Sequence, residues 1–137
     1  MVQLLTGGKG EGKTKRLIDM ANNALQASEG HIVFVDDDKR HIYDLHYKIR
    51  FIETEEFPIE NHKMFIGFIF GILSQDRDIE KIFVDGVSNI IKDISMEEFE
   101  ALIKSLDAIS KRSNVDFILT MNKKVSELPE ALQQYVA

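Results

Sequence analysis

A glycine-rich segment near the N-terminus has the residue types and spacing that hold phosphate groups. It reads Gly7-Gly8-Lys9-Gly10-Glu11-Gly12-Lys13-Thr14, which is the Walker A pattern of glycine, four residues, glycine, lysine, and serine or threonine. Glycines let backbone N–H groups approach an anion, because they adopt positive φ and carry no side chain. Lys13 would reach the β- and γ-phosphates, and the Thr14 hydroxyl would coordinate Mg²⁺. Residues 7–14 therefore predict a site for the phosphates and Mg²⁺ of a nucleotide.

The elements around this segment agree with that chemistry, which needs a strand, a loop and a helix in that order. Residues 2–6 form a short apolar run that predicts a buried strand. A helix is predicted from Lys13 to about Ser28, with Gly30 as its left-handed cap. One face of this helix carries the apolar residues Leu17, Ile18, Ala21, Ala24 and Leu25.

Three further apolar runs end in polar residues. The run 31–35 ends in Asp36-Asp37-Asp38, the run 81–84 in Asp85, and the run 115–121 in Asn122. Ligands of parallel α/β sheets bind beyond the carboxyl ends of the strands, so these residues are candidate site residues. Asp85 follows its apolar run as a Walker B aspartate does, and predicts a second oxygen ligand for Mg²⁺.

Strands and helices alternate along the whole chain. A short helix is predicted over 39–48, a strand over 49–53, and a helix capped by Asn61 that runs to about Ser74. Ser95 and Glu98 form a capping box before a helix with core residues Phe99, Leu102, Ile103, Leu106 and Ile109. A short last helix follows Pro129. The pattern predicts one domain over residues 1–137, a three-layer α/β/α sandwich with a mainly parallel sheet.

The middle of the helix at 64–73 is apolar on every side. It is too short to cross a membrane, which takes about 20 residues. One interpretation is a helix packed between the sheet and another element. The other is that the side with Gly67 and Gly71 binds a protein partner or a second copy of the chain.

Composition limits the classes of function. The chain has 17 basic and 23 acidic residues and a net charge of −6, which argues against broad binding to nucleic acid. It has no cysteine, so disulfides and thiolate metal sites are excluded. The first strand begins almost at Met1, without the basic and apolar segments of a signal peptide, so we expect a cytoplasmic protein.

The order of these parts resembles the P-loop ATPase core of RecA-like proteins over residues 2–123. The resemblance rests on the Walker A segment, the strand ending in Asp36-Asp37-Asp38, the Walker B strand ending in Asp85, and the strand Phe117–Asn122. It implies a RecA-like fold that binds ATP and Mg²⁺. It also implies that Asp38, or next Asp37, activates the attacking water, and that Asn122 senses the γ-phosphate. A helix cap is the alternative role of Asp38.

We therefore expect a slow or partner-stimulated Mg²⁺-dependent ATPase that acts as a switch or accessory protein. One alternative is a small-molecule or nucleoside kinase, although Arg77 and Arg112 do not lie in a lid-like insertion. Another is a non-enzymatic interaction module with a vestigial nucleotide site. ATP is expected rather than GTP because Asn122-Lys123-Lys124-Val125 lacks the aspartate of the guanine-binding motif.

Overall fold

The structure is a computed structural model that describes residues 1–137. Its strands are β1 (Val2–Leu5), β2 (His31–Asp36), β3 (Arg50–Glu53), β4 (Ile79–Val84) and β5 (Asp116–Thr120). Its longer helices are α1 (Lys13–Ala27), α2 (His62–Gln75) and α4 (Met96–Ser113). The single-turn elements are η1 (Ile42–Asp44), α3 (Val87–Ile90), η2 (Val125–Glu127) and α5 (Glu130–Gln133).

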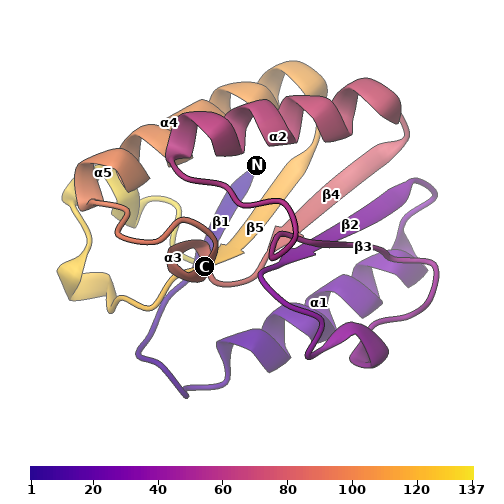
Figure 1. The fold of residues 1–137 in the computed structure, drawn as a ribbon, viewed down its shortest axis with the longest axis horizontal. Coiled ribbons are helices and arrows are strands. Elements are labelled where there is room, and N and C mark those ends of the chain that lie inside the picture. Colours follow the sequence, from indigo (N-terminus) through magenta and orange to yellow (C-terminus); the bar gives the residue numbers. More distant parts are fainter.

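The five strands form one sheet in the order β1-β5-β4-β2-β3, and every neighbouring pair is parallel. Helices cover both faces of this sheet: α2 and α4 lie on one face and α1 on the other (Figure 1). The predicted α/β class with a parallel sheet is confirmed. Strand β5 comes last in the chain but lies between β1 and β4, so it separates the first strand from the strand that leads to Asp85.

Each face of the sheet has its own apolar core. The larger core fills the space under α2 and α4, and includes Phe65, Phe99 and Phe117, none of which is exposed. The smaller core lies under α1, where Leu17, Ile18 and Ala21 pack against Phe34 of β2. The predicted core residues of α4, from Phe99 to Ile109, are all buried. These two cores fix the strand ends on which the polar residues lie.

Local signals predicted the helix starts well. Asn61 caps α2, since its side-chain oxygen accepts the N–H of Met64 at 2.9 Å. Ser95 and Glu98 form the predicted capping box of α4. Strand β3 and the short last helix after Pro129 also form as expected.

The prediction of a helix over 39–48 is wrong. Only the 3₁₀ turn Ile42–Asp44 forms there. Turns and side chains satisfy the backbone of this loop in place of a helical ladder: the N–H of Arg40 donates to the Asp38 carboxylate, and the N–H of His46 donates to Asn22. Short polar side chains compete with helix formation in this way. The loop from residue 37 to residue 49 is called the β2–β3 loop below.

The prediction that Gly30 caps α1 in the left-handed conformation is also wrong, because its φ is not positive. The glycine is needed there for space. A Cβ at Gly30 would lie 2.4 Å from the carbonyl oxygen of Asp78, so a side chain would collide with the chain entering β4. The single turn α3, which follows Gly86 in the left-handed conformation, was not predicted.

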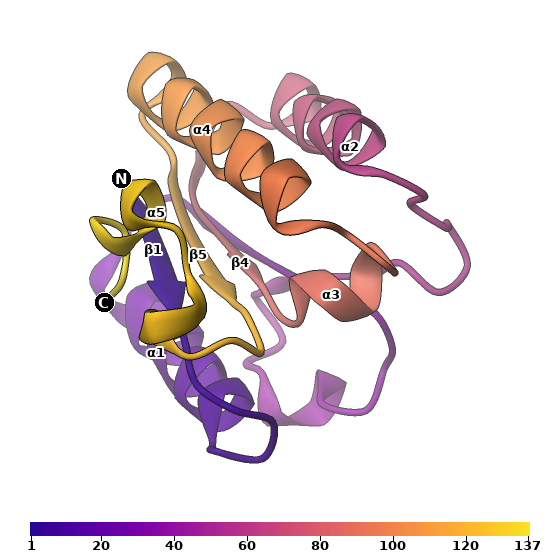
Figure 2. The ribbon, with the colours of Figure 1, turned by 90° about the vertical axis from the view of Figure 1, so that its left-hand side faces the viewer.

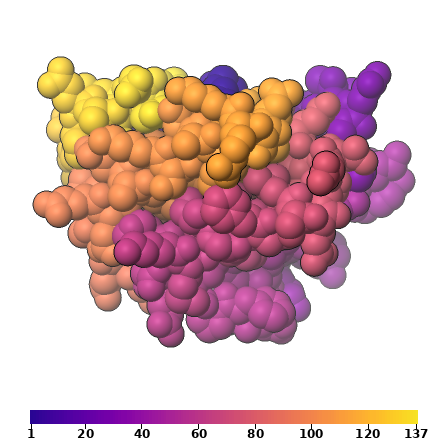
Figure 3. Space-filling view, turned by 90° about the horizontal axis from the view of Figure 1, so that it is seen from above, coloured from indigo at the N-terminus to yellow at the C-terminus, as the bar shows by residue number.

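Helices α2 and α4 run side by side across one face of the molecule (Figure 3). Phe65 and Ile69 of α2 are buried, whereas Met64 and Phe70 on its outer side are 44% and 45% exposed. The helix is thus packed on one side only. No helix of the chain has the length and apolar character needed to cross a membrane.

The last residues of the chain pair with the first strand. Leu4 donates its N–H to the carbonyl of Tyr135, and its own carbonyl accepts the N–H of Ala137. The C-terminal segment therefore lies alongside β1 (Figure 2). It covers the edge of β1 that does not face β5.

Candidate functional site

The glycine-rich segment connects β1 to α1 as a loop with three residues of positive φ. They are Gly7, Gly10 and Gly12, with φ of 141°, 83° and 81°. Gly8 does not need this conformation. Any other residue would be strained at these three positions, and this explains why the loop requires glycine.

Unpaired N–H groups collect where this loop meets α1. The N–H groups of Gly10, Gly12, Lys13, Thr14 and Lys15 donate to no backbone carbonyl. Those of the first helical turn have no helical partner, and they lie at the positive end of the helix dipole. Such a group of donors is suited to bind an anion.

The Lys13 ammonium group folds back on this loop. It donates to the carbonyl of Gly8 at 2.6 Å, so it lies beside the loop whose bound phosphates it is expected to contact. The N–H of Gly7 donates to the carbonyl of Lys123, which ties the loop to the segment after β5. The loop is thereby held at both sides while several of its donors stay free.

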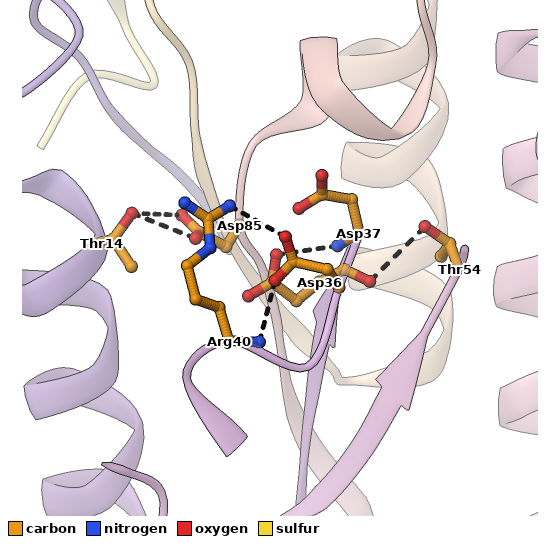
Figure 4. Close-up of polar contacts among 7 residues, drawn as sticks. Thr14, Asp36, Asp37, Arg40, Thr54 and Asp85 are labelled. Atoms are coloured by element: carbon orange, nitrogen blue, oxygen red, sulfur yellow. Dashed lines mark hydrogen bonds and ion pairs between the residues drawn. The ribbon is translucent and has the colours of Figure 1, made fainter. Parts of the chain in front are cut away.

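The two expected magnesium ligands are in contact. The hydroxyl of Thr14 lies 3.2 Å and 3.1 Å from the two carboxylate oxygens of Asp85, although 71 positions separate these residues (Figure 4). They meet because α1 begins beside the end of β4. A hydroxyl and a carboxylate oxygen at this separation are the kind of hard ligands that Mg²⁺ prefers.

Thr120 holds Asp85 in this position. Its hydroxyl donates to Asp85 at 2.8 Å and accepts the N–H of Gly86 at 2.7 Å. Thr120 is the last residue of β5, the strand between β1 and β4, so it reaches Asp85 from the side. Asp85 is 8% exposed, and the two hydroxyl donors compensate for much of the cost of burying its carboxylate.

The three aspartates after β2 have different surroundings. Asp36 is 2% exposed, and its Oδ2 atom has no hydrogen-bond partner. Burial raises the pKa of Asp36 to about 8, and the hydrogen bond with Asp37 and the negative charge of Asp85 add to this effect. Asp38 instead bonds Arg40 at 2.9 Å, and the Arg40 guanidinium lowers the pKa of that carboxyl.

One cavity of about 930 Å³ joins these groups. Its wall includes Lys9, Gly10, Gly12, Lys13 and Thr14 from the loop and α1, Asp36, Asp37 and Arg40 from the β2 side, and Asp85, Thr120 and Asn122. Only one residue in the wall, Ile18, is hydrophobic. Among the expected site residues, Gly7, Gly8, Glu11 and Asp38 do not line it.

Two residues of this wall, Thr120 and Arg40, were not among the candidates from the sequence, and a third, Asp36, was selected as a strand end without a role of its own. Asp36, not Asp37 or Asp38, is the buried carboxylate beside Asp85. Thr120 could have been found as the polar residue that ends an apolar strand, the same signal that selected Asn122. Arg40 had no signal of its own, because its position depends on the path of the β2–β3 loop.

Two groups of metal-ligand type occur in the structure. One is Asp36, Asp37 and Asp38 at the cavity; the other is His31, Asp76 and Asp78 at the opposite ends of the strands. Asp76 in the second group is already in contact with His31 and forms an ion pair with Arg50, each at 2.6 Å. The carboxylates suited to a cation at the cavity are therefore Asp85 with Thr14, and the aspartates after β2.

Comparisons with known proteins add no assignment. No protein-family model matches the chain, and no curated protein matches it.

Proposed function

We propose that this chain is a small P-loop nucleotide-binding protein of the RecA-like type that binds ATP with Mg²⁺. One observation carries the proposal: the hydroxyl of Thr14 and the carboxylate of Asp85 meet within 3.2 Å, beside Lys13 and a loop with free N–H groups. This arrangement combines a pair of oxygen ligands, a lysine ammonium group and a group of free N–H donors. Together they match the requirements of a bound triphosphate and its metal.

The residues divide the work by chemistry. The N–H groups of residues 10–15 and the Lys13 ammonium bind phosphate oxygens, while Thr14 and Asp85 coordinate Mg²⁺, which neutralises phosphate charge. Thr120 orients Asp85. The polar wall of the cavity favours the phosphates over an apolar ligand.

Hydrolysis is proposed to be slow or dependent on a partner. A general base must accept a proton from water, and the carboxylates after β2 are the candidates: Asp38 and Asp37 from the resemblance, and Asp36 from its burial. Asp38 bonds Arg40, and Asp36 has a raised pKa, which favours its neutral form in the nucleotide-free chain. Neither Asp38 nor Asp36 is poised as a free base, which favours a switch over a fast enzyme and leaves Asp37, in the wall of the cavity, as the base to test.

A nucleoside kinase remains the second candidate. It would need an acceptor pocket and an arginine that closes over the phosphates. Arg77 and Arg112 do not line the cavity, and Arg112 lies over the ring of Phe70 at 5.8 Å. Arg40 does line it, but Asp38 holds its guanidinium at 2.9 Å, and no acceptor pocket is identified beside it. The switch is therefore favoured, with α2 as a candidate partner surface and the cytoplasm as the expected location.

Calorimetry with ATP and Mg²⁺ tests the proposal. The wild-type chain is expected to bind, and Lys13→Ala to weaken binding by at least about tenfold, because a charged hydrogen bond contributes about 1.5–3 kcal/mol. The matched control is Lys104→Ala, since Lys104 is an exposed lysine of α4 that pairs with Glu100. No heat from the wild type at millimolar nucleotide would overturn the proposal. Phosphate release measured on the same samples separates an ATPase from a kinase, which would phosphorylate an added acceptor.

A further inference from the structure

Arg40 is the one arginine in the wall of the cavity. It leaves the β2–β3 loop with its guanidinium directed toward the side where Thr14 and Asp85 meet (Figure 4). Its side chain is 69% exposed, so protein packing does not fix its position. A hydrogen bond does so instead: one guanidinium nitrogen lies 2.9 Å from Asp38.

The surroundings of this guanidinium are acidic. Its pKa is raised first by Asp38, with smaller effects from Asp37 and Asp36. Asp38 itself does not line the cavity, whereas Arg40 does. The Asp38 carboxylate therefore lies in the β2–β3 loop outside the cavity, while the Arg40 guanidinium lies in the cavity wall with the glycine-rich segment.

We propose that Arg40 senses the terminal phosphate of the bound nucleotide. In the nucleotide-free chain its guanidinium is held by Asp38, and in the triphosphate complex it turns to the oxygens of the γ-phosphate. This inference rests on the proposed function and adds a regulatory step to it. The diphosphate lacks the group that Arg40 contacts, so only the triphosphate releases Asp38.

The exchange is physically reasonable for two reasons. An exposed ion pair such as Arg40–Asp38 contributes little stability, so it breaks easily. The planar guanidinium binds phosphate through two parallel hydrogen bonds, which are stronger than bonds between neutral groups.

In this proposal the β2–β3 loop changes conformation when Arg40 contacts the γ-phosphate. His41 and Asp44 of this loop line the same cavity, and Tyr43 and Tyr47 of the loop are 97% and 85% exposed. A turn of Arg40 away from Asp38 removes one of the two side-chain contacts at the start of the loop, the other being the Lys39–Glu53 ion pair at 3.9 Å. The exposed tyrosines then become the part of the surface that reports the nucleotide state.

The test compares the dissociation constants of ATP and ADP, each with Mg²⁺, by calorimetry. Arg40→Ala is expected to weaken ATP by about tenfold or more and ADP by less than about threefold. Asp38→Asn removes the competing carboxylate charge, and is expected to strengthen ATP by about two- to fivefold without affecting ADP. Arg112→Ala, an exposed arginine of the last turn of α4, is the matched control and should change neither constant.

The outcomes separate this inference from the function on which it rests. If Lys13→Ala abolishes ATP binding while Arg40→Ala leaves the ATP-to-ADP ratio unchanged, the sensor is overturned and the nucleotide site stands. Equal weakening of ATP and ADP by Arg40→Ala also overturns it. If the wild-type chain binds no nucleotide, both proposals fail. Thermal melting of each variant shows whether it is folded.

Discussion

Thr14 at the start of α1 and Asp85 after β4 form a hydroxyl-to-carboxylate hydrogen bond of 3.1–3.2 Å in the wall of the cavity. Neither residue could reach the other unless β1 and β4 had the same direction in the sheet. This contact is the most direct means of testing the metal site, because a substitution at Thr14 can remove one hydroxyl without changing the volume of the side chain.

Thr14→Val is therefore expected to weaken ATP binding in Mg²⁺ by about tenfold, since a lost hydrogen bond or ligand costs about 1–3 kcal/mol. Binding in EDTA should change much less. Thr14→Ser keeps the hydroxyl and is the control, with affinity close to that of the wild type. A Thr14→Val variant with full Mg²⁺-dependent affinity would remove Thr14 from the metal site.

Thr120→Val is expected to lower the free energy of unfolding by about 1–3 kcal/mol, measured by urea denaturation. The substitution leaves the N–H of Gly86 without its acceptor and removes the shorter of the two hydrogen bonds to Oδ1 of Asp85. It should also reduce the Mg²⁺ dependence of ATP binding. Thr54→Val is the comparison, because the hydroxyl of that buried threonine makes only a long bond of 3.4 Å to a backbone carbonyl. Equal effects of the two substitutions would contradict a special role for Thr120.

Asp36 predicts a dependence of stability on pH. Its pKa is raised from 3.8 to about 8 in the folded chain, so between these pH values the native state keeps a proton that the unfolded chain has lost. The stability from this group is complete below pH 3.8 and is lost as the pH rises to about 8. Asp36→Asn imitates the protonated form, and should raise the free energy of unfolding at pH 8.5 by at least about 1 kcal/mol.

The measurement compares urea denaturation at pH 5.5 and pH 8.5 in EDTA without nucleotide. The advantage of Asp36→Asn over the wild type should be larger at the higher pH. Asp107→Asn is a suitable control, because Asp107 is a half-buried carboxylate of α4 that pairs with Lys111. An advantage independent of pH would mean that Asp36 is ionised throughout the range.

Substitution of Gly67 and Gly71 tests whether the outer side of α2 binds a partner or a second copy of the chain. A Cβ at Gly67 or Gly71 would meet no atom within 4 Å. Alanine at either position should therefore stabilise an isolated chain by about 0.5–1 kcal/mol, because glycine is unfavourable inside a helix. If a second copy or a partner helix approaches closely at this side, the same substitutions should weaken the association, as seen by analytical ultracentrifugation. Glu97→Ala, at the exposed first turn of α4, controls for general surface changes.

The features that depend on residues close together in the chain, such as helix caps and the glycine-rich segment, were predicted from the sequence. Lys13 and Thr14 lie in one turn of a helix, and Ser95 and Glu98 form their cap within four positions, so spacing alone defines the chemistry. The ends of the apolar runs also predicted the strand ends, and with them Asp85 and Asn122 in the wall of the cavity.

Residues whose position depends on the order of strands were not predicted. Thr120 reaches Asp85 only because β5 inserts between β1 and β4, and no local pattern encodes that neighbour relation. Asp36 was selected as a strand end, but its burial was not predicted, because that burial depends on β4 and β3 lying on either side of β2. Arg40 was hidden by the mistaken helix over 39–48: a regular helix would have directed its side chain differently from the observed loop.

Because Tyr135 and Ala137 pair with Leu4, the two edges of the sheet, at β1 and at β3, differ. Each edge is called a margin below. The C-terminal segment occupies both backbone groups of Leu4 at the margin of β1, so an incoming strand from another polypeptide cannot pair with Leu4 there. The four-residue β3 at the opposite margin stays open to such an addition. Lengthening of the sheet across two molecules is therefore expected at the margin of β3, next to the segment that carries Tyr47.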